Sequence, residues 1–182
     1  MKQKILLDIG HSKKKAGAKG EYKLNCMQAE ACRDYLEPLG FKVEIYDPDI
    51  DDLASIGKHA AGFDCFVSFH LNSCKDKTVD YSTCIVDSRH TKASSFLLAK
   101  RIMASLTTDS SFKAYRGTEG EGLMLLPLVI LNNAERASKC PCVMVESFFV
   151  SNSENQKHLQ TKSILAGHLV GRGIQDYFMQ VL

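Results

Sequence analysis

The chain has 182 residues, of which 45% are hydrophobic and 24% are charged, and its formal net charge is +2. This composition and length are those of a soluble globular protein with one domain, residues 1–182. The small net charge argues against a general nucleic-acid-binding protein, which usually carries a strong basic excess. No apolar run reaches the roughly 18–20 residues of a membrane span. The N-terminal stretch MKQKILLDIGH does not resemble a signal peptide, because its apolar segment is too short and it lacks a cleavage site.

In chain order, apolar runs of strand length alternate with helical patterns. Strands are predicted at residues 4–9, 41–46, 65–69, 82–87 and 142–145, and helices at about 22–39, 91–106 and near the C-terminus, with a short helix ending near residue 61. The first helix has an apolar stripe from Tyr22 to Leu39 and is closed by Gly40. Ser151 and Glu154 have capping-box spacing, while residues 107–140 give no clear pattern. The alternation predicts an α/β single-domain sandwich, in which a mostly parallel twisted sheet has helices on both faces.

The seven cysteines show no spacing typical of a disulfide framework. Cys26, Cys32 and Cys65 fall on the predicted buried faces of a helix and a strand, where cysteine packs as a small hydrophobic residue. We therefore expect no structural disulfide and a protein made in a reducing cytoplasm.

Three of the predicted strands are followed at once by a side chain that can bind a metal or transfer a proton. These side chains are His11 after residues 4–9, His70 after residues 65–69 and Glu146 after residues 142–145. Glu21 stands just before the first helix. Because ligands bind at the carboxyl edge of open α/β sheets, we expect these four residues to converge in one crevice.

Two imidazoles and one carboxylate suit a catalytic zinc ion, since three protein ligands leave the fourth position for water. A second carboxylate held away from the metal, Glu146, could then take a proton from that water. Each residue alone also has a simpler interpretation. Either histidine could be capped or solvated, Glu21 could be a favourable acid in the first turn of a helix, and Glu146 could pair with a lysine.

Four blocks of the sequence resemble those of the zinc-dependent N-acetylmuramoyl-L-alanine amidases of the amidase type 3 family. The blocks are LLDIGH, AGAKGE, VSFHLNS and VMVESFFVSN, and they occur in the family's order along essentially the whole chain. Two features depart from the family pattern. SKKK replaces the usual Gly-Gly after the first histidine, and the Arg and Asn usual before the third block are missing around SIGKHAAGFD.

The resemblance implies that His11, Glu21 and His70 bind one Zn²⁺ per chain and that Glu146 is the catalytic glutamate. It implies hydrolysis of the peptidoglycan amide between N-acetylmuramic acid and L-alanine of the stem peptide, with zinc activating the water. Asn72 belongs to the third block, and Arg116 is the one arginine in the loop around YRGTEGEG. We predict that both contact substrate.

Among the members of this family, the chain resembles a single-domain bacteriophage endolysin, made in the host cytoplasm and acting on the cell wall after release. The expected partner is bacterial peptidoglycan, without nucleic acid or stable membrane insertion, and we expect a monomer. The basic cluster at residues 13–19 either draws the enzyme to an anionic wall or is a solvated loop. A bacterial autolysin, another zinc peptidase such as a carboxypeptidase, and a non-catalytic wall-binding module remain alternatives.

Overall fold

The computed structural model describes residues 2–15, 17–18, 20–48, 52–117 and 119–181, and its centre is one six-stranded sheet. The strands are β1 (Lys4–Ile9), β2 (Lys42–Tyr46), β3 (Cys65–Asn72), β4 (Thr83–Asp87), β5 (Leu123–Leu126) and β6 (Cys142–Phe149). The α-helices are α1 (Glu21–Leu36), α2 (Leu53–Lys58), α3 (Ala93–Leu106), α4 (Val129–Ala137) and α5 (Leu159–Val181). Two 3₁₀ turns, Glu37–Leu39 and Asn155–Lys157, complete the described helical segments.

The strand order is β2-β1-β3-β6-β4-β5, and the sheet is mostly parallel, as the sequence predicts. The pairs β1–β2, β1–β3, β3–β6 and β4–β5 are parallel, whereas β4 runs antiparallel to β6. The strands β4 and β5 therefore run opposite to the other four. The carboxyl ends of β1, β3 and β6 are adjacent at the centre of one edge of the sheet.

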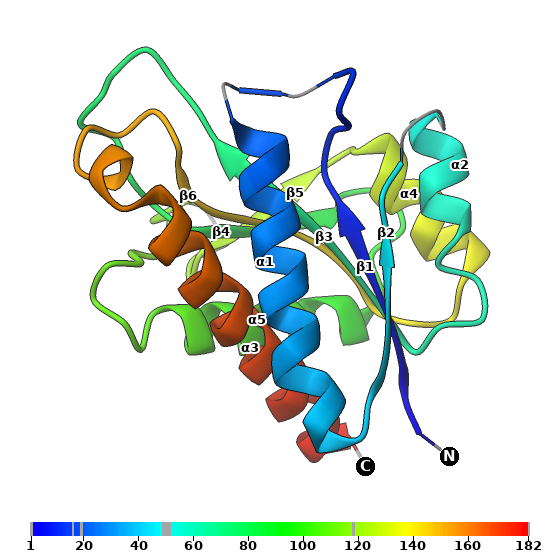
Figure 1. Ribbon diagram of the computed structural model, residues 1–182. Helices are drawn as coiled ribbons and strands as arrows, with labels where there is room; N and C mark the ends of the chain where they lie inside the picture. The colour runs from blue at the N-terminus through cyan, green and yellow to red at the C-terminus, as the bar shows by residue number, and fades with distance from the viewer. Residues whose placement is uncertain (1, 16, 19, 49–51, 118, 182) are drawn as a thin grey trace.

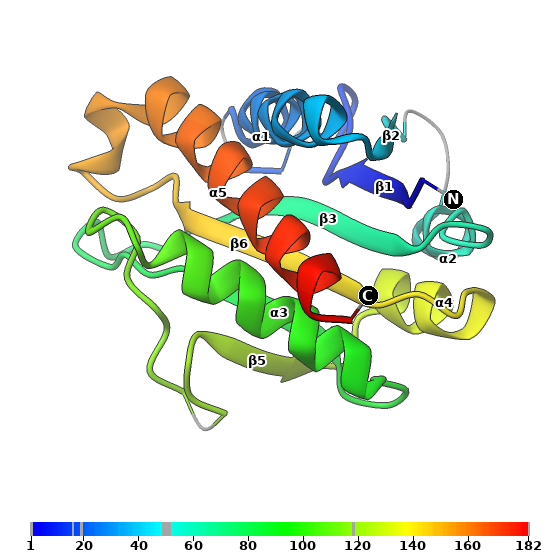
Figure 2. The same cartoon turned by 90° about the horizontal axis from the view of Figure 1, so that it is seen from below.

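Helices cover both faces of the sheet (Figure 1). One face packs against α1, α3 and α5, with α5 lying between the other two helices (Figure 2). The other face packs against α2 and α4 through a smaller apolar cluster that includes Leu6, Phe66 and Leu131. Alternate residues of each central strand serve the two clusters, so Leu7 faces α1 while Leu6 faces α4. None of the described helices is long and apolar enough to span a membrane.

The buried face of α1 differs from the predicted stripe. Tyr22 and Cys26 are only partly buried, and Leu39 is 48% exposed beyond the end of α1. The fully buried positions include the polar residues Asn25 and Gln28. The middle of the predicted stripe is confirmed, since Ala29, Cys32 and Leu36 are fully buried, but the apolar pattern did not include the two polar side chains, which are buried in hydrogen bonds of their own, described below. Gly40 does end the helical segment, with a left-handed φ of 95°.

Two further differences concern the second half of the chain. The predicted capping box of Ser151 and Glu154 is wrong, because the side chain of Asn152 accepts the N–H groups of Glu154 and Asn155 instead. The Ser151 hydroxyl accepts the N–H of Cys74, on another loop. Residues 107–140, which gave no clear pattern, contain β5 and α4.

Candidate metal centre and cavity

The chain turns sharply at the end of β1 and directs His11 toward the start of α1. His11 has a left-handed φ of 68°, which is uncommon for a residue with a side chain. Its Nε2 atom lies 3.1 Å from Oε1 of Glu21, the first residue of α1. The turn therefore places an imidazole from the loop after β1 against a carboxylate on the helix.

His70 approaches the same carboxylate oxygen from β3. Its Nδ1 atom lies 3.4 Å from Glu21 Oε1, and its ring stands edge-on to that of His11 with centroids 4.9 Å apart. One ligand atom from each of the three residues lies within 4.8 Å of the others. The structure thus brings together the three residues that the sequence analysis selected as metal ligands.

Glu21 is buried and held in place from several directions. Its Oε2 accepts the N–H of Ala18 at 2.8 Å, and its Oε1 accepts the N–H of Leu71 at 3.1 Å. Burial alone raises the pKa of Glu21, but hydrogen bonds from the two histidines and these two N–H groups outweigh it and hold the pKa well below its usual value. Glu21 is therefore an anion at neutral pH.

This cluster has the donors that zinc prefers, and the two separations measured from Glu21 suit the ion. A tetrahedral ion about 2.0–2.2 Å from each ligand needs ligand atoms roughly 3.3–3.6 Å apart, close to the 3.1 and 3.4 Å separations from Glu21. Space is kept free by Gly17, where an added Cβ would lie 2.5 Å from both Glu21 Oε2 and His11 Nε2. The residues present therefore fit a zinc ion with three protein ligands.

Glu146 is next to His70, on the neighbouring strand β6. The two residues are partners in the parallel register of β3 and β6. The Oε2 atom of Glu146 is buried and has no hydrogen-bond partner among the described residues. Burial raises the pKa of Glu146 to about 7, partly opposed by the two histidines. The carboxyl group is thus poised to exchange a proton near neutral pH.

A cavity of about 670 Å³ opens beside these residues, on the face of the sheet that packs against α2 and α4. His11, His70 and Glu146 line one side of it. The opposite side is apolar and includes Leu53 and Ile56 from α2, and Leu128 and Val129 at the start of α4. A substrate group bound at the metal-competent cluster would therefore lie against an apolar wall.

A buried polar chain that was not predicted from the sequence supports the cluster. Asn25 donates to the carbonyl of Gly10 at 3.1 Å and accepts from Gln28, which in turn accepts the hydroxyl of Ser147 on β6. This chain ties α1 to the end of β1 and to β6 on either side of the cluster. Its signal in the sequence is the spacing of Glu21, Asn25 and Gln28, which places three polar residues on one helical face.

The two predicted substrate contacts lie in different places. Asn72 is at the end of β3, two residues beyond His70, and its buried Nδ2 has no partner among the described residues. Arg116 is exposed and lines a second cavity of about 950 Å³ together with Tyr81 and Tyr115. Arg116 does not line the cavity beside His70. Both assignments stay predictions.

The comparison with protein families decides the assignment. A family model described as N-acetylmuramoyl-L-alanine amidase matches residues 5–176. The chain belongs to this amidase family. The match includes every residue of the cluster and both strands of the reversed pair. No curated protein sequence matches the chain.

Solved structures of such amidases share the fold of this amidase over nearly its whole length. Ami1 from Mycobacterium smegmatis has a TM-score of 0.82 at 16% identity, covering 98% of this chain and 97% of its own. The CwlD amidase from Clostridioides difficile, solved in complex with the GerS lipoprotein, gives 0.76 at 20% identity, with coverages of 98% and 99%. The catalytic domain of the CD27L endolysin, which targets Clostridia Difficile, gives 0.67 at 22% identity, with coverages of 98% and 97%.

Proposed function

We propose that this amidase is zinc-dependent and cleaves the amide between N-acetylmuramic acid and L-alanine in bacterial peptidoglycan. His11 Nε2, Glu21 Oε1 and His70 Nδ1 would hold one zinc ion per chain. The observation that carries this proposal is the meeting of these three atoms beside Glu146 at one edge of the sheet. When bound, zinc supplies a Lewis acid that polarises the amide carbonyl and makes the attacking water more acidic.

Glu146 moves the protons in this proposal. Its Oε2, which has no hydrogen-bond partner in the described part of the chain, accepts the proton of the attacking water, and the same oxygen then gives a proton to the departing amine of L-alanine. A group that must both take and give a proton works best with a pKa near the working pH, which suits the raised pKa of Glu146, about 7. Asn72 and Arg116 are proposed contacts to the glycan or the stem peptide.

The products of peptidoglycan digestion test the reaction directly. The proposed cleavage releases new L-alanine amino termini without new reducing sugars, whereas a carboxypeptidase would release free amino acids from the other end of the stem peptide. A wall-binding module would release nothing. His70→Ala should lose zinc and activity together, and a folded variant that keeps both would remove His70 from the ligand set.

The biological setting that we propose is lysis of a bacterial host by an endolysin, rather than wall turnover by an autolysin. The support is the fold shared with an endolysin catalytic domain, together with exposed lysines beside the metal-competent cluster. Cytoplasmic expression in a bacterium should be harmless until the membrane is permeabilised, and rapid lysis should follow. Lysis without permeabilisation, or none after it, would contradict this setting and leave the reaction itself untouched.

A further inference from the structure

Asp8 is a buried carboxylate in the wall of the cavity and has no role in the mechanism described above. It is 1% exposed, at the second-last position of β1. Its Oδ2 accepts a hydrogen bond of 2.5 Å from the Ser68 hydroxyl on β3, whereas its Oδ1 is buried without a hydrogen-bond partner among the described residues. An orphaned carboxylate oxygen is costly, so its retention calls for a partner that forms in the working state.

The arrangement of β1 and β3 shows which group lies nearby. Asp8 and Ser68 are partners in the register, and the following pair is Ile9 with Phe69, so His70 lies opposite Gly10. An added Cβ on Gly10 would lie 2.3 Å from His70 Nε2. The imidazole of His70 therefore occupies the space of the side chain that Gly10 lacks.

Asp8 and Gly10 are two residues apart on one strand, so they face the same side of the sheet, about 6.6 Å apart along the strand. Asp8 and His70 also line the same cavity. Because the Ser68 hydroxyl fixes Oδ2, Oδ1 is left to serve the imidazole, either directly or through one water molecule.

We propose that Asp8 is a positioning residue, whose Oδ1 accepts the Nε2–H of His70 and thereby keeps Nδ1 free to bind the metal. This inference rests on the proposed zinc function. A ligating nitrogen must carry no proton, so the neutral ring of His70 must hold its proton on Nε2. A carboxylate that accepts this proton also fixes the plane of the ring and makes Nδ1 more basic.

Without Asp8, Glu21 would favour the other tautomer of His70, in which the ring proton is on Nδ1. Glu21 Oε1 lies 3.4 Å from Nδ1 and can accept a proton held there. That tautomer cannot bind a metal through Nδ1 and must first convert to the one protonated on Nε2. Losing Asp8 therefore weakens metal binding even if all three ligands remain. The predicted defect is thus a weaker zinc affinity and a change in whether Nε2 of His70 carries the ring proton. Both can be measured separately from catalysis.

The experiment measures the zinc dissociation constant by competition with a chelator in Asp8→Ala, Asp8→Asn and the matched control Ser68→Ala. The control removes a hydrogen bond of the same carboxylate but leaves Oδ1 in place. Asp8→Ala should weaken zinc binding by about 10–100-fold, the usual effect of losing such a partner. Asp8→Asn keeps a carbonyl acceptor and should lose less, and Ser68→Ala should lose least.

Nitrogen NMR of the zinc-loaded protein gives a readout that a merely structural role would not move. The Nε2–H proton of His70 should be visible and slow to exchange in the wild type and in Ser68→Ala, and should exchange rapidly in Asp8→Ala. The double variant Asp8→Leu, Ser68→Ala replaces both partners by apolar groups and preserves the fold if the single variant does not. This double variant should show the same weaker zinc binding and the same rapid exchange of the His70 Nε2–H proton as Asp8→Ala.

Wild-type zinc affinity and an unchanged Nε2–H signal in a folded variant without an acceptor at position 8 would overturn the inference. That result would leave the proposed function intact, because the wild type and the variant would both bind zinc. If the wild type itself bound no zinc, the proposed metal function would fail and this inference with it.

Discussion

Glu146 and His70 are partners in the register of β6 and β3, and Thr83 of β4 pairs with Glu146 from the other side. The carboxylate that we propose transfers protons is thus carried by a central strand with hydrogen-bonded neighbours on both sides. Sites on strands hold their side chains more precisely than sites on loops. Exchange of this carboxylate for a group of equal shape should therefore change the chemistry without disturbing the ligands.

Glu146→Gln should bind zinc as the wild type does, fold normally and still bind peptidoglycan. Its turnover should fall by about 10²–10⁴-fold, the range for loss of a positioned acid–base group. Metal analysis and release of L-alanine amino termini measure the two effects. Glu154→Gln is a matched control, since Glu154 is an exposed carboxylate that pairs with Lys157 in a surface turn. Loss of zinc from Glu146→Gln would instead identify Glu146 as a ligand.

The same substitution should change how the stability of the zinc-free protein depends on pH. Burial raises the pKa of Glu146 from 4.5 to about 7, so between these values the folded state binds more protons than the unfolded state. The free energy of unfolding of the wild type should therefore fall as pH rises from about 4.5 to 7. Glu146→Gln has no titrating carboxyl group at this position, so its free energy of unfolding should not fall in this way. Above pH 7 the variant should therefore be more stable than the wild type.

Thermal unfolding with a chelator present, at several pH values, checks this expectation. Burial lowers the pKa of His70, but Glu21 and Glu146 outweigh it and raise the pKa, which adds a slope of the same sign. The difference between the two proteins, rather than the slope of either, therefore reports on Glu146 together with the part of the His70 pKa shift that Glu146 causes. Parallel curves for the two proteins would show that Glu146 does not titrate in this range.

Gly17 and Gly20 allow the space around the ligands to be tested separately from backbone strain. Both have a left-handed φ, 70° and 83°, but an added Cβ would crowd Glu21 and His11 only at Gly17. Each alanine variant should lose about 1–2 kcal/mol of stability from the backbone alone. Only Gly17→Ala should also lose zinc affinity, as chelator competition would measure. Equal zinc affinity in the two variants would contradict the proposed position of the ion.

The cysteines should all titrate as free thiols. The structure has seven free cysteines, of which Cys26 and Cys74 are partly exposed and the other five are buried. Burial raises the pKa of Cys26, so Cys74 should react first with a thiol reagent in the native protein. Unfolding without a reductant should expose all seven thiols. A deficit of two would reveal a disulfide.

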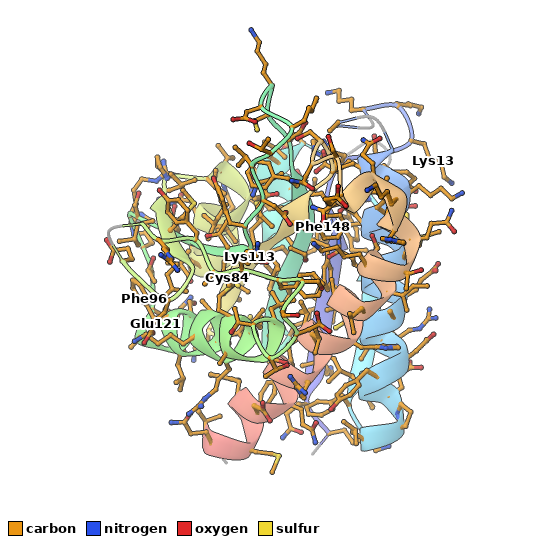
Figure 3. All side chains as sticks on the ribbon, turned by 90° about the vertical axis from the view of Figure 1, so that its left-hand side faces the viewer. Lys13, Cys84, Phe96, Lys113, Glu121 and Phe148 are labelled. Carbon is orange, nitrogen blue, oxygen red and sulfur yellow. The ribbon has the colours of Figure 1, made fainter. Side chains whose placement is uncertain are left out.

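Lys13, Lys14 and Lys15 should steer the enzyme toward an anionic wall at low ionic strength. Ser12 and Lys15 exchange backbone hydrogen bonds, which holds these exposed lysines on a tight turn. Figure 3 shows Lys13 at the outer end of this loop. The rest of the basic cluster includes residues 16 and 19, which lie outside the described residues.

Changing the three lysines to Gln should slow lysis mainly at low salt, because charges are screened beyond about 10 Å at 0.1 M. Lys2, Lys4 and Lys42 are exposed near the starts of β1 and β2, at the opposite end of the sheet, and give a control with the same change in charge. If both triple variants respond alike to salt, the turn is only a solvated loop.

The sequence was sufficient to predict the strands next to His11, His70 and Glu146, because each begins as an apolar run followed by one polar residue, and parallel strands bring such residues to one edge. The predicted ends at residues 69 and 145 are wrong, since β3 continues to Asn72 and β6 to Phe149, so His70 and Glu146 lie within their strands. The direction of β4 could not be predicted, because strand polarity depends on the connections and leaves no local pattern. The four residues of β5 were too few to show a period, and the buried Asn25 and Gln28 resemble surface residues until their partners are known.

The reversal of β4 and β5 divides the edge of the sheet near the candidate metal centre into two parts that differ in how far their lengths can change. The proposed ligands come from the turn after β1, from the start of α1 and from β3, and a change in the length of these elements would move them. The connections at residues 73–82 and 107–122 reach the same edge, since β4 and β5 begin there. Insertions and deletions in these two connections, which include residues of the second cavity such as Tyr81 and Arg116, can therefore change the surface at this edge while the proposed ligands stay fixed. In this architecture the range of substrates can therefore change through these two connections, without a change in the residues that carry out the reaction.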